Sequence, residues 1–585
     1  VTGSTGGGTG TTVFTTGSAG SFSIKAINTS GIDATGNYSY SEGFGNQAVG
    51  EASHAEGGFP GKGYFNIAAG TSSHAEGSNT RASGASSHAE GFFTTAIANN
   101  SHAEGTGTKT FGSNSHAEGN DSITYGSASH AEGELTIASG DTSHAEGFQT
   151  TSLGVASHAQ GYQTTASGDY AHAEGILNIA SGDASHAEGG FDGKGTIPNT
   201  ASGVSSHAEG GNTTASGGFS HAEGTNTIAS GDTSHAEGTS TTALGIASHA
   251  EGENNLASGR ASHAEGGVHF NGKGTVIQAT SATTYSSHSE GRGTLASGQA
   301  SHAEGAFTVA SGQDSHAEGN NTLASGQASH AEGFLTVASG IWSHAEGNQN
   351  LASGDASHAE GGFNGKSSQP TSATTVSAHA EGVGTLASGA ASHAEGLVTS
   401  ATATAAHAEG SQTIASGVES HAQNTNTVAS ANSSHAGGNL SIASGIESFV
   451  HSKNSLVSGD RSAVLGGQNI TGATDDTVYV PYLNINNLAT GTSVNNLGID
   501  SSGNVVTGST GGGTGDFLPL TGGTLSGETL PILTIYGSGD TSPIFSVQGS
   551  NGELFSITDN LDGQLFAVND ISGLPVLEVY SDNTI

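Results

Sequence analysis

One short motif, S-H-A-E-G, recurs through most of this chain at intervals of 14 residues. His74, His88 and His102 mark consecutive copies, and all of the 28 histidines except His269 and His451 occupy the same motif position. The full unit reads S-H-A-E-G-x-x-T-[ILV]-A-S-G-x-x, which is two five-residue stretches of alternating character separated by glycine-bearing turns. A short fixed period of this kind predicts a β-solenoid, in which each coil stacks on the next through parallel backbone hydrogen bonds about 4.8 Å apart.

The composition favours such a stack over a globular core. Glycine contributes 96 of the 585 residues and aromatic residues only 5%, so little large apolar surface is available for burial. Order must therefore come from backbone ladders. We expect about 29 coils, which would form a rod roughly 140 Å long.

The charge balance argues against two classes of partner. The chain has 11 Lys plus Arg against 51 Asp plus Glu, a formal net charge of -40, which opposes binding to nucleic acid or to anionic membranes. There is no cysteine for a disulfide or a thiolate metal site, and no signal peptide or membrane-inserting segment is recognisable. Because the sequence lacks methionine and opens on Val1, we expect it to begin inside a longer or processed protein.

Side-chain alternation assigns the two faces of the S-H-A-E-G strand. Ser, Ala and Gly share one face and His and Glu the other. The small residues must point into a coil this thin, so the His and Glu side chains point outward as two parallel ladders. Representative ladder positions are His74, Glu76, His88, Glu90, His102, Glu104, His116, Glu118, His130, Glu132, His144, Glu146, His302, Glu304, His316, Glu318, His330 and Glu332.

The glutamate ladder needs a compensating partner. Like charges about 4.8 Å apart repel by about 0.9 kcal/mol in water and by more where water is excluded. The histidine two residues away is the obvious partner, as a hydrogen-bond donor to the carboxylate and, when protonated, as a counter-charge.

An apolar stripe occupies the second strand, seven residues after each histidine. Either it packs inside the coil or it contacts another chain. We favour a chain contact, because a narrow polar rod gains most of its burial by association. The stripe includes Ile137, Leu295, Val309, Leu323, Val337 and Leu351.

The repeat resembles a known design. The pattern S-x-A-x-G-x-x-T-x-A-x-G over residues 23–470 is similar to the YadA-like head of trimeric autotransporter adhesins. The resemblance implies a left-handed parallel β-roll that trimerises along its length. That family typically has apolar residues where this chain has His and Glu, so a shared facing implies that the ladder lines the trimer axis as a polar core. If it instead faces solvent, it is a surface array.

A second resemblance concerns the C-terminal part. The segment "DFLPLTGGTLSG" at 516–527 is similar to a linker motif of bacteriophage tail fibres, and Phe545, Phe555, Phe566 and Leu577 recur between glycine turns as in a β-repeat shaft. We therefore predict four parts: a linker from a preceding module at 1–22, the β-roll at 23–470, a β-rich connector at 471–515, and the tail-fibre-like motif with its short β-rich shaft at 516–585.

These observations predict a structural component of a homotrimeric extracellular fibre. The first reading is a virion (phage) tail fibre that mediates or supports host attachment and contacts other fibre or tail proteins. The alternative is a cell-surface trimeric adhesin head of a bacterium. The two differ in what would follow residue 585, a receptor-binding tip or a membrane-anchoring barrel.

Four insertions interrupt the spacing and open with similar text, such as "GGFPGKG" and "GGFDGKG". Insertions in solenoids emerge as surface loops, a usual place for binding. They either contact a host receptor, for example a glycan, or brace an adjacent subunit. The candidate contact residues are Phe59, Lys62, Phe191, Lys194, Phe270, Lys273, Phe363 and Lys366.

Histidine beside a carboxylate also suggests chemistry. Catalysis needs one distinguished constellation with a pocket, whereas these pairs are identical, so we predict no enzyme and no catalytic residue. Three chains would bring three His and three Glu per layer toward one axis, a ligand set that suits zinc, nickel or iron. Direct hydrogen bonding accounts for the pairs without a cofactor, and we favour it, while an axial metal or small ions stay open. Charged pairs buried at the axis would raise the histidine pKa.

Overall fold

The computed structural model describes the repeat region and several short segments after it. All secondary-structure elements in these residues are β-strands. The chain divides into two units, residues 1–483 and 484–585, each of which is described by itself. The described residues are 14–16, 22–26, 32–58, 65–190, 197–267, 269–270, 276–362, 369–482, 497–499, 505–507, 545–549, 552–557, 564–570, 574–582 and 584–585.

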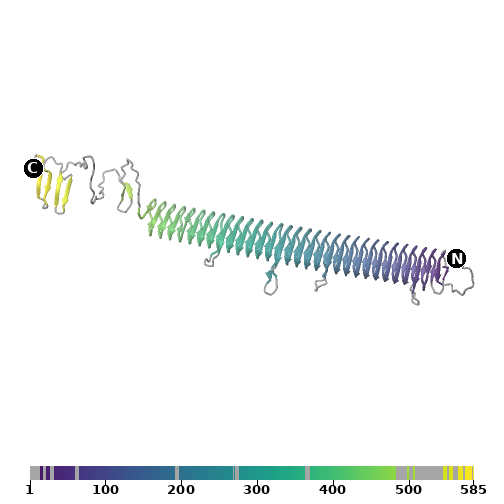
Figure 1. The fold of residues 1–585 in the computed structure, drawn as a ribbon. Coiled ribbons are helices and arrows are strands. Elements are labelled where there is room, and N and C mark those ends of the chain that lie inside the picture. Colours follow the sequence, from purple (N-terminus) through teal and green to yellow (C-terminus); the bar gives the residue numbers. More distant parts are fainter. Residues whose placement is uncertain are drawn as a thin grey trace, which may run out of the picture. The chain divides into compact units, whose positions relative to one another are not determined.

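The first unit is a parallel β-solenoid built from two kinds of strand (Figure 1). Strands that begin at the motif histidine position have even numbers and form one sheet, running from β4 (Tyr40–Ser41) to β34 (His263–Gly267) and from β38 (His288–Arg292) to β64 (Val478–Tyr479); histidine occupies the position in most of them. Two-residue strands with odd numbers form the second sheet. These run from β3 (Asp33–Ala34) to β33 (Leu256–Ala257) and from β37 (Ser281–Ala282) to β63 (Thr471–Gly472).

The register confirms the predicted coil length. Strand β10 (His88–Phe92) pairs in parallel with β8 (His74–Ser78) on one side and with β12 (His102–Thr106) on the other, so that His88 lies opposite His74 and His102. The fold is thus the expected all-β solenoid of 14-residue coils. It begins with β2 (Ile24–Ala26), which pairs with β4 in parallel and with β1 (Phe14–Thr16) in antiparallel fashion.

The interior of each coil is filled by small side chains. In one representative coil Ser73, Ala75, Thr80 and Ala82 are each at most 1% exposed, as the alternation predicted. The serine hydroxyl closes the turn before it, since Ser73 Oγ donates to the Gly70 carbonyl oxygen at 2.8 Å. No large side chain fits between two sheets this close, which explains why Ala and Thr dominate the core.

The turns contain glycine, as the sequence predicted, for example Gly84. Each regular coil also places non-glycine residues at positive φ, such as Ser86 (φ 59) and Phe93 (φ 59). Their N–H groups donate to carbonyls of the preceding coil, Ser86 to Thr71 at 2.7 Å and Phe93 to Ser78 at 3.0 Å. These inter-coil hydrogen bonds offset a conformation that costs about 1 kcal/mol or more per residue.

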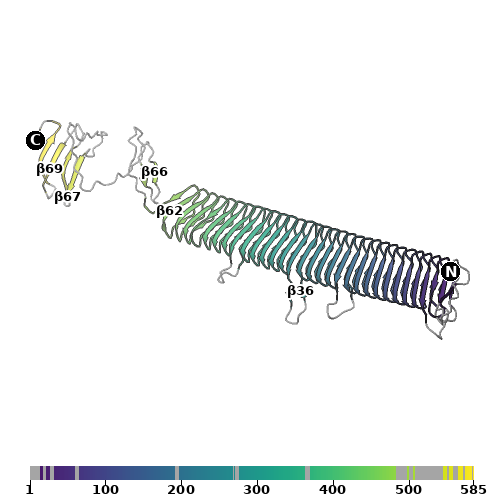
Figure 2. The same ribbon diagram turned by 45° about the vertical axis from the view of Figure 1, so that its right-hand side comes forward.

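Other strands lie outside the regular coils (Figure 2). Within the third insertion, β35 (His269–Phe270) and β36 (Val276–Gln278) form an antiparallel pair.

The last solenoid strands of the even-numbered sheet are β62 (Ala463–Gln468) and β64, so coil pairing continues to Tyr479.

The second unit contains two small antiparallel sheets in its described residues. One is formed by β65 (Leu497–Ile499) and β66 (Val505–Thr507). The other joins β67 (Phe545–Gly549), β68 (Gly552–Ile557), β69 (Gln564–Asn569) and β70 (Pro575–Tyr580) in that order. Consecutive aromatic rings of the predicted shaft repeat meet in this sheet: Phe555 lies 5.9 Å from Phe545 and 4.9 Å from Phe566 between ring centroids.

A candidate site: the histidine and glutamate ladder

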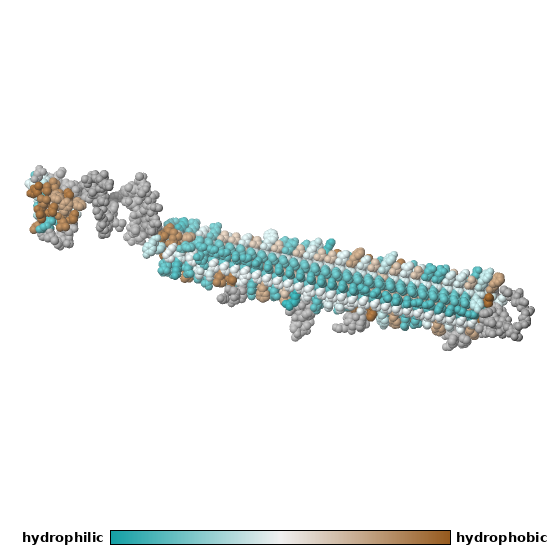
Figure 3. All heavy atoms as spheres, viewed as in Figure 1, coloured by the Kyte–Doolittle hydropathy of each residue, from teal (hydrophilic) through white to brown (hydrophobic). Residues whose placement is uncertain are grey.

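The ladder histidines and glutamates point outward from the even-numbered sheet, as the alternation predicted. In β8 the buried Ala75 separates His74 and Glu76, whose side chains are 31% and 44% exposed. The same half-buried positions recur on strand after strand. Figure 3 shows the result, a continuous hydrophilic band along the solenoid.

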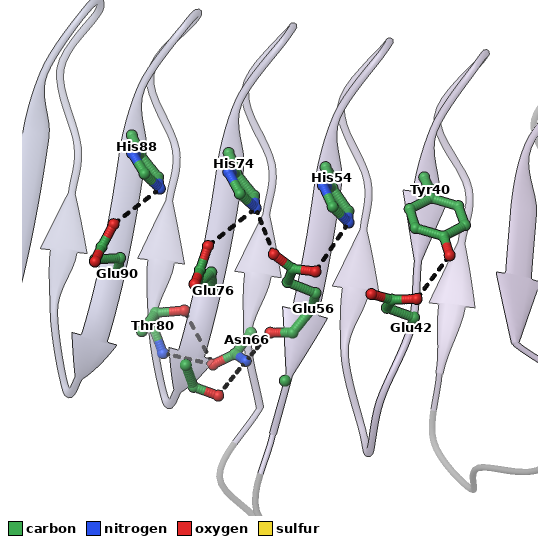
Figure 4. A network of polar contacts seen from close by, with 12 residues as sticks. Tyr40, Glu42, His54, Glu56, Asn66, His74, Glu76, Thr80, His88 and Glu90 are labelled. Carbon is green, nitrogen blue, oxygen red and sulfur yellow. Dashed lines mark hydrogen bonds and ion pairs between the residues drawn. The ribbon is translucent and has the colours of Figure 1, made fainter.

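The histidines form a stack of parallel rings. Neighbouring ring centroids are 4.6 Å apart for His54 and His74 and 4.7 Å apart for His74 and His88, with interplanar angles of 3° and 2° (Figure 4). The stack continues to His421, where the next ring, His435, turns to an edge-on angle of 75°. Backbone pairing imposes this spacing, because each imidazole sits one strand above its equivalent.

Many of the ladder histidines lie near a carboxylate without a well-formed hydrogen bond to it. His88 Nε2 is 3.7 Å from Glu90 Oε2, and His102 Nε2 is 3.4 Å from Glu104 Oε2. These Nε2 atoms are shielded from solvent yet have no hydrogen-bond partner. The direct hydrogen bond that we favoured from the sequence is therefore not formed at these pairs.

The pKa of many ladder histidines is shifted downward. Burial is the main cause at His74, His102 and His144, and the adjacent imidazoles add to it, lowering the pKa of His102 to about 4. The raised pKa expected from the sequence applies to charged pairs buried at a trimer axis, and it stays a prediction. In the single chain each ring removes water from its neighbours and would repel their protonated forms. With its pKa lowered to about 4, His102 is neutral at pH 7, so its contact with Glu104 is not a salt bridge at that pH.

Near both ends of the ladder other residues replace histidine or glutamate. We drew no conclusion from these replacements in the sequence. At the start Tyr40 replaces histidine, and its hydroxyl donates to Glu42 at 2.7 Å, which lowers the pKa of Glu42. Burial and the carboxylates of Glu42 and Glu76 raise the pKa of Glu56 to about 7. Near the other end Gln423 takes the glutamate position. The tyrosine at a motif histidine position was the sequence feature from which this end of the ladder could have been predicted.

The glutamates of successive coils line an open groove beside the histidine stack. Its walls include Glu90, Glu104, Glu118 and Glu132. Ligand atoms also gather in threes: His54, Glu56 and His74 each offer one within 4.8 Å of the other two. Four further groups continue this series to His116–Glu118–His130, and 15 more such groups of possible ligands are found in the described residues.

The apolar stripe lies on the outer side of the odd-numbered sheet. The stripe positions named from the sequence are all half-buried, and each is next to a fully buried alanine; they are Ile137, Leu295, Val309, Leu323, Val337 and Leu351. Ile228, Ile414 and Ile442 are between 39% and 42% exposed. The stripe does not pack inside the coil.

Most of the candidate loop residues lie outside the described residues. These are Phe59, Lys62, Phe191, Lys194, Lys273, Phe363 and Lys366, and only the backbone of Phe270 is described.

The bases of the insertions are well defined, and they show a feature that sequence reasoning missed. Each coil just before an insertion has asparagine where threonine is usual: Asn46, Asn178, Asn255 and Asn350. The buried Asn178 side chain donates to the Gly189 carbonyl at the base of the insertion, at 3.0 Å. The other three asparagines make the equivalent bond, at 2.9 to 3.0 Å.

The fold and the ladder define this chain as a parallel β-solenoid repeat protein with a polar outer ladder. No protein-family model matches the chain, and no curated protein matches it. None of the described segments forms a helix long and apolar enough to cross a membrane.

Proposed function

We propose that this chain is a structural component of a homotrimeric extracellular fibre, and specifically of a virion tail fibre that supports attachment to a host. The observation that carries the proposal is the ladder of identical outward-facing residues along the solenoid. His and Glu recur on this face, while the loop-edge positions after them vary from Ser78 to Phe92 to Thr106.

The regularity of the ladder indicates what covers it. The ladder presents the same side chains at every strand spacing. A partner can make the same contacts along its whole length only if its own surface repeats with that spacing. A second and third copy of this chain have that period by construction, and closed rotational symmetry is the usual form of such assemblies. In this arrangement the ladder lines the common axis.

The apolar stripe supports association independently. Half-exposed Ile, Leu and Val side chains extend along the opposite sheet, and rows of this length are unusual on the surface of a monomer. Contact with a neighbouring chain would bury them. The net charge of -40 directs the proposal away from nucleic acid and anionic membranes as partners.

We further propose a structural rather than a catalytic role. The His–Glu pairs of the described coils form a series of near-identical members, whereas an active site needs one constellation unlike its surroundings. The polar groove is lined by equivalent glutamates from successive coils, such as Glu104 and Glu118, which fits a repeating interface.

Native mass spectrometry of the purified chain, in a buffer with a chelator, tests the proposal. A trimer has three times the 57.1 kDa mass of one chain. Negative-stain electron microscopy of the same sample should show rods with a straight part of roughly 140 Å. A stable monomer at micromolar concentration would contradict the fibre and leave the ladder as a solvent-facing array.

A bacterial cell-surface adhesin head is the second candidate, favoured by the similarity of the 14-residue pattern to YadA-like heads. Immunogold labelling with an antibody against the solenoid separates the two locations. Labelled virion fibres support the first proposal, and a labelled layer on the surface of cells without phage supports the second.

A further inference from the structure

The ladder histidines present an unused ligand atom at regular intervals. Their Nε2 atoms, including those of His54, His74 and His88, are shielded from solvent and make no hydrogen bond in the described structure. A buried polar atom without a partner costs about 1–3 kcal/mol, so a long series of them calls for a bound species.

The nearest polar atoms are carboxylate oxygens at distances close to those within a metal coordination sphere. Around Glu56, Oε2 is 3.7 Å from His54 Nε2 and Oε1 is 3.3 Å from His74 Nε2 (Figure 4). Ligands about 2.0–2.1 Å from a tetrahedral zinc ion lie about 3.3 Å apart. A small rotation of the two side chains, whose rings are 4.6 Å apart, brings both nitrogens within reach of one ion.

The electrostatics of the ladder also favour a cation. Successive glutamates such as Glu104 and Glu118 lie one strand apart on neighbouring coils and line one groove, so their carboxylates repel each other. The ion pair of Arg461 with Asp476 lies beyond the ladder. Neutral imidazole with carboxylate is a preferred ligand set of zinc and related transition metals.

We propose that the ladder is a linear array of zinc-type binding sites, each made of the histidine and glutamate of one coil and the histidine of the next. Two Nε2 atoms and one carboxylate oxygen supply three ligands, and the fourth position is open to water or to another carboxylate. The sites lie within a single chain, so they do not depend on the proposed trimer or on a virion.

Sharing of histidines limits the occupancy. His74 belongs both to the group with His54 and Glu56 and to the group with Glu76 and His88. One Nε2 atom binds one ion, so adjacent groups cannot both be filled. Full loading is therefore one ion per two coils, about ten ions per chain, with neighbouring ions about 10 Å apart.

Equilibrium dialysis of the full chain against zinc chloride, followed by elemental analysis, measures this stoichiometry. The test variant combines His74→Gln, His102→Gln and His130→Gln, which breaks all five groups from His54 to His130 without changing the formal charge. A control variant combines Glu134→Gln, Glu253→Gln and Glu447→Gln, which removes exposed carboxylates outside the ladder. Circular dichroism checks that both variants keep the β-fold.

The expected result is saturation near one zinc per two coils, a loss of about three ions in the histidine variant and no loss in the control. Cobalt(II) in place of zinc should show the strong visible absorption of a tetrahedral nitrogen and oxygen site. Equal binding by wild type and the histidine variant, or a weak octahedral cobalt spectrum, would overturn the proposal and assign the binding to surface carboxylates. Native mass spectrometry in chelator reports the trimer separately, so the two proposals fail independently.

Discussion

Two glycines of the same coil should respond very differently to one added methyl group. Gly133 lies within the ladder strand β16 (His130–Glu134) at φ +114, and a Cβ placed on it would lie 2.0 Å from the Gly147 carbonyl oxygen of the next coil. Gly140, in the turn of the same coil, would also meet a carbonyl oxygen closely, at 1.8 Å from Gly154, but its φ is not positive. Other coils have Ala98 or Ala403 at that turn position, so the turn adjusts to a methyl group.

The expected cost of Gly133→Ala follows from strain and lost pairing. A φ near +114 lies outside the left-handed helical region and costs a residue with a Cβ about 1–3 kcal/mol. Moving the strand away from Gly147 weakens one or two inter-coil hydrogen bonds, at about 1 kcal/mol each. The total is about 2–5 kcal/mol. Gly140→Ala should cost less than about 1 kcal/mol, because natural coils tolerate alanine there.

Hydrogen exchange is the suitable assay, because a solenoid opens locally between neighbouring coils and need not unfold in one step. Gly133→Ala should speed exchange in peptides that cover residues 126–147, whereas Gly140→Ala should leave them close to wild type. Equal protection in the two variants would refute the argument from φ and inter-coil distance.

Three further predictions concern other parts of the coil. In chelator, the lowered histidine pKa values mean that the unfolded chain takes up protons first below about pH 6.5. Stability should therefore be fully present above that pH and decline toward pH 4, the approximate pKa of His102; a melting temperature equal at pH 7.5 and pH 5 would contradict this. Asn178→Ala should lose about 1–3 kcal/mol by unpairing buried carbonyls at the base of an insertion, and Asn178→Thr clearly less, as measured by exchange at Gly189. Ala331→Leu should cost about 1–3 kcal/mol by overfilling a fully buried site, measured by thermal melting with Ala331→Gly as a control for the loss of volume.

The sequence predicted the solenoid and both of its faces because two simple rules decide them. The interval between motif histidines sets the coil, and alternation within S-H-A-E-G places Ala75 inside and His74 outside. Neither rule specifies the conformations of the outward-facing side chains. The missing His88–Glu90 hydrogen bond depends on these conformations, and the lowered pKa of His102 comes from burial first and from the neighbouring imidazoles second.

One feature that we did not predict is visible in the amino-acid sequence. Asparagine replaces threonine in the coil before each insertion, as at Asn46 and Asn350. Its significance depends on the hydrogen bond to a carbonyl of the next coil, which spacing alone does not show. The positive φ of turn residues such as Phe93 had no comparable signal, because side chains of many kinds occupy that position.

Residue-for-residue pairing of coils, as between β8 and β10, has a consequence for how the gene can change. Adding or removing fourteen codons at once keeps every side chain on its own face and alters the length of the rod by one strand spacing, about 4.8 Å. Other numbers shift the pattern unless the extra residues leave the coil as an insertion. Nearly identical repeats also favour unequal recombination, so the length of this protein is heritable in discrete steps that preserve its fold.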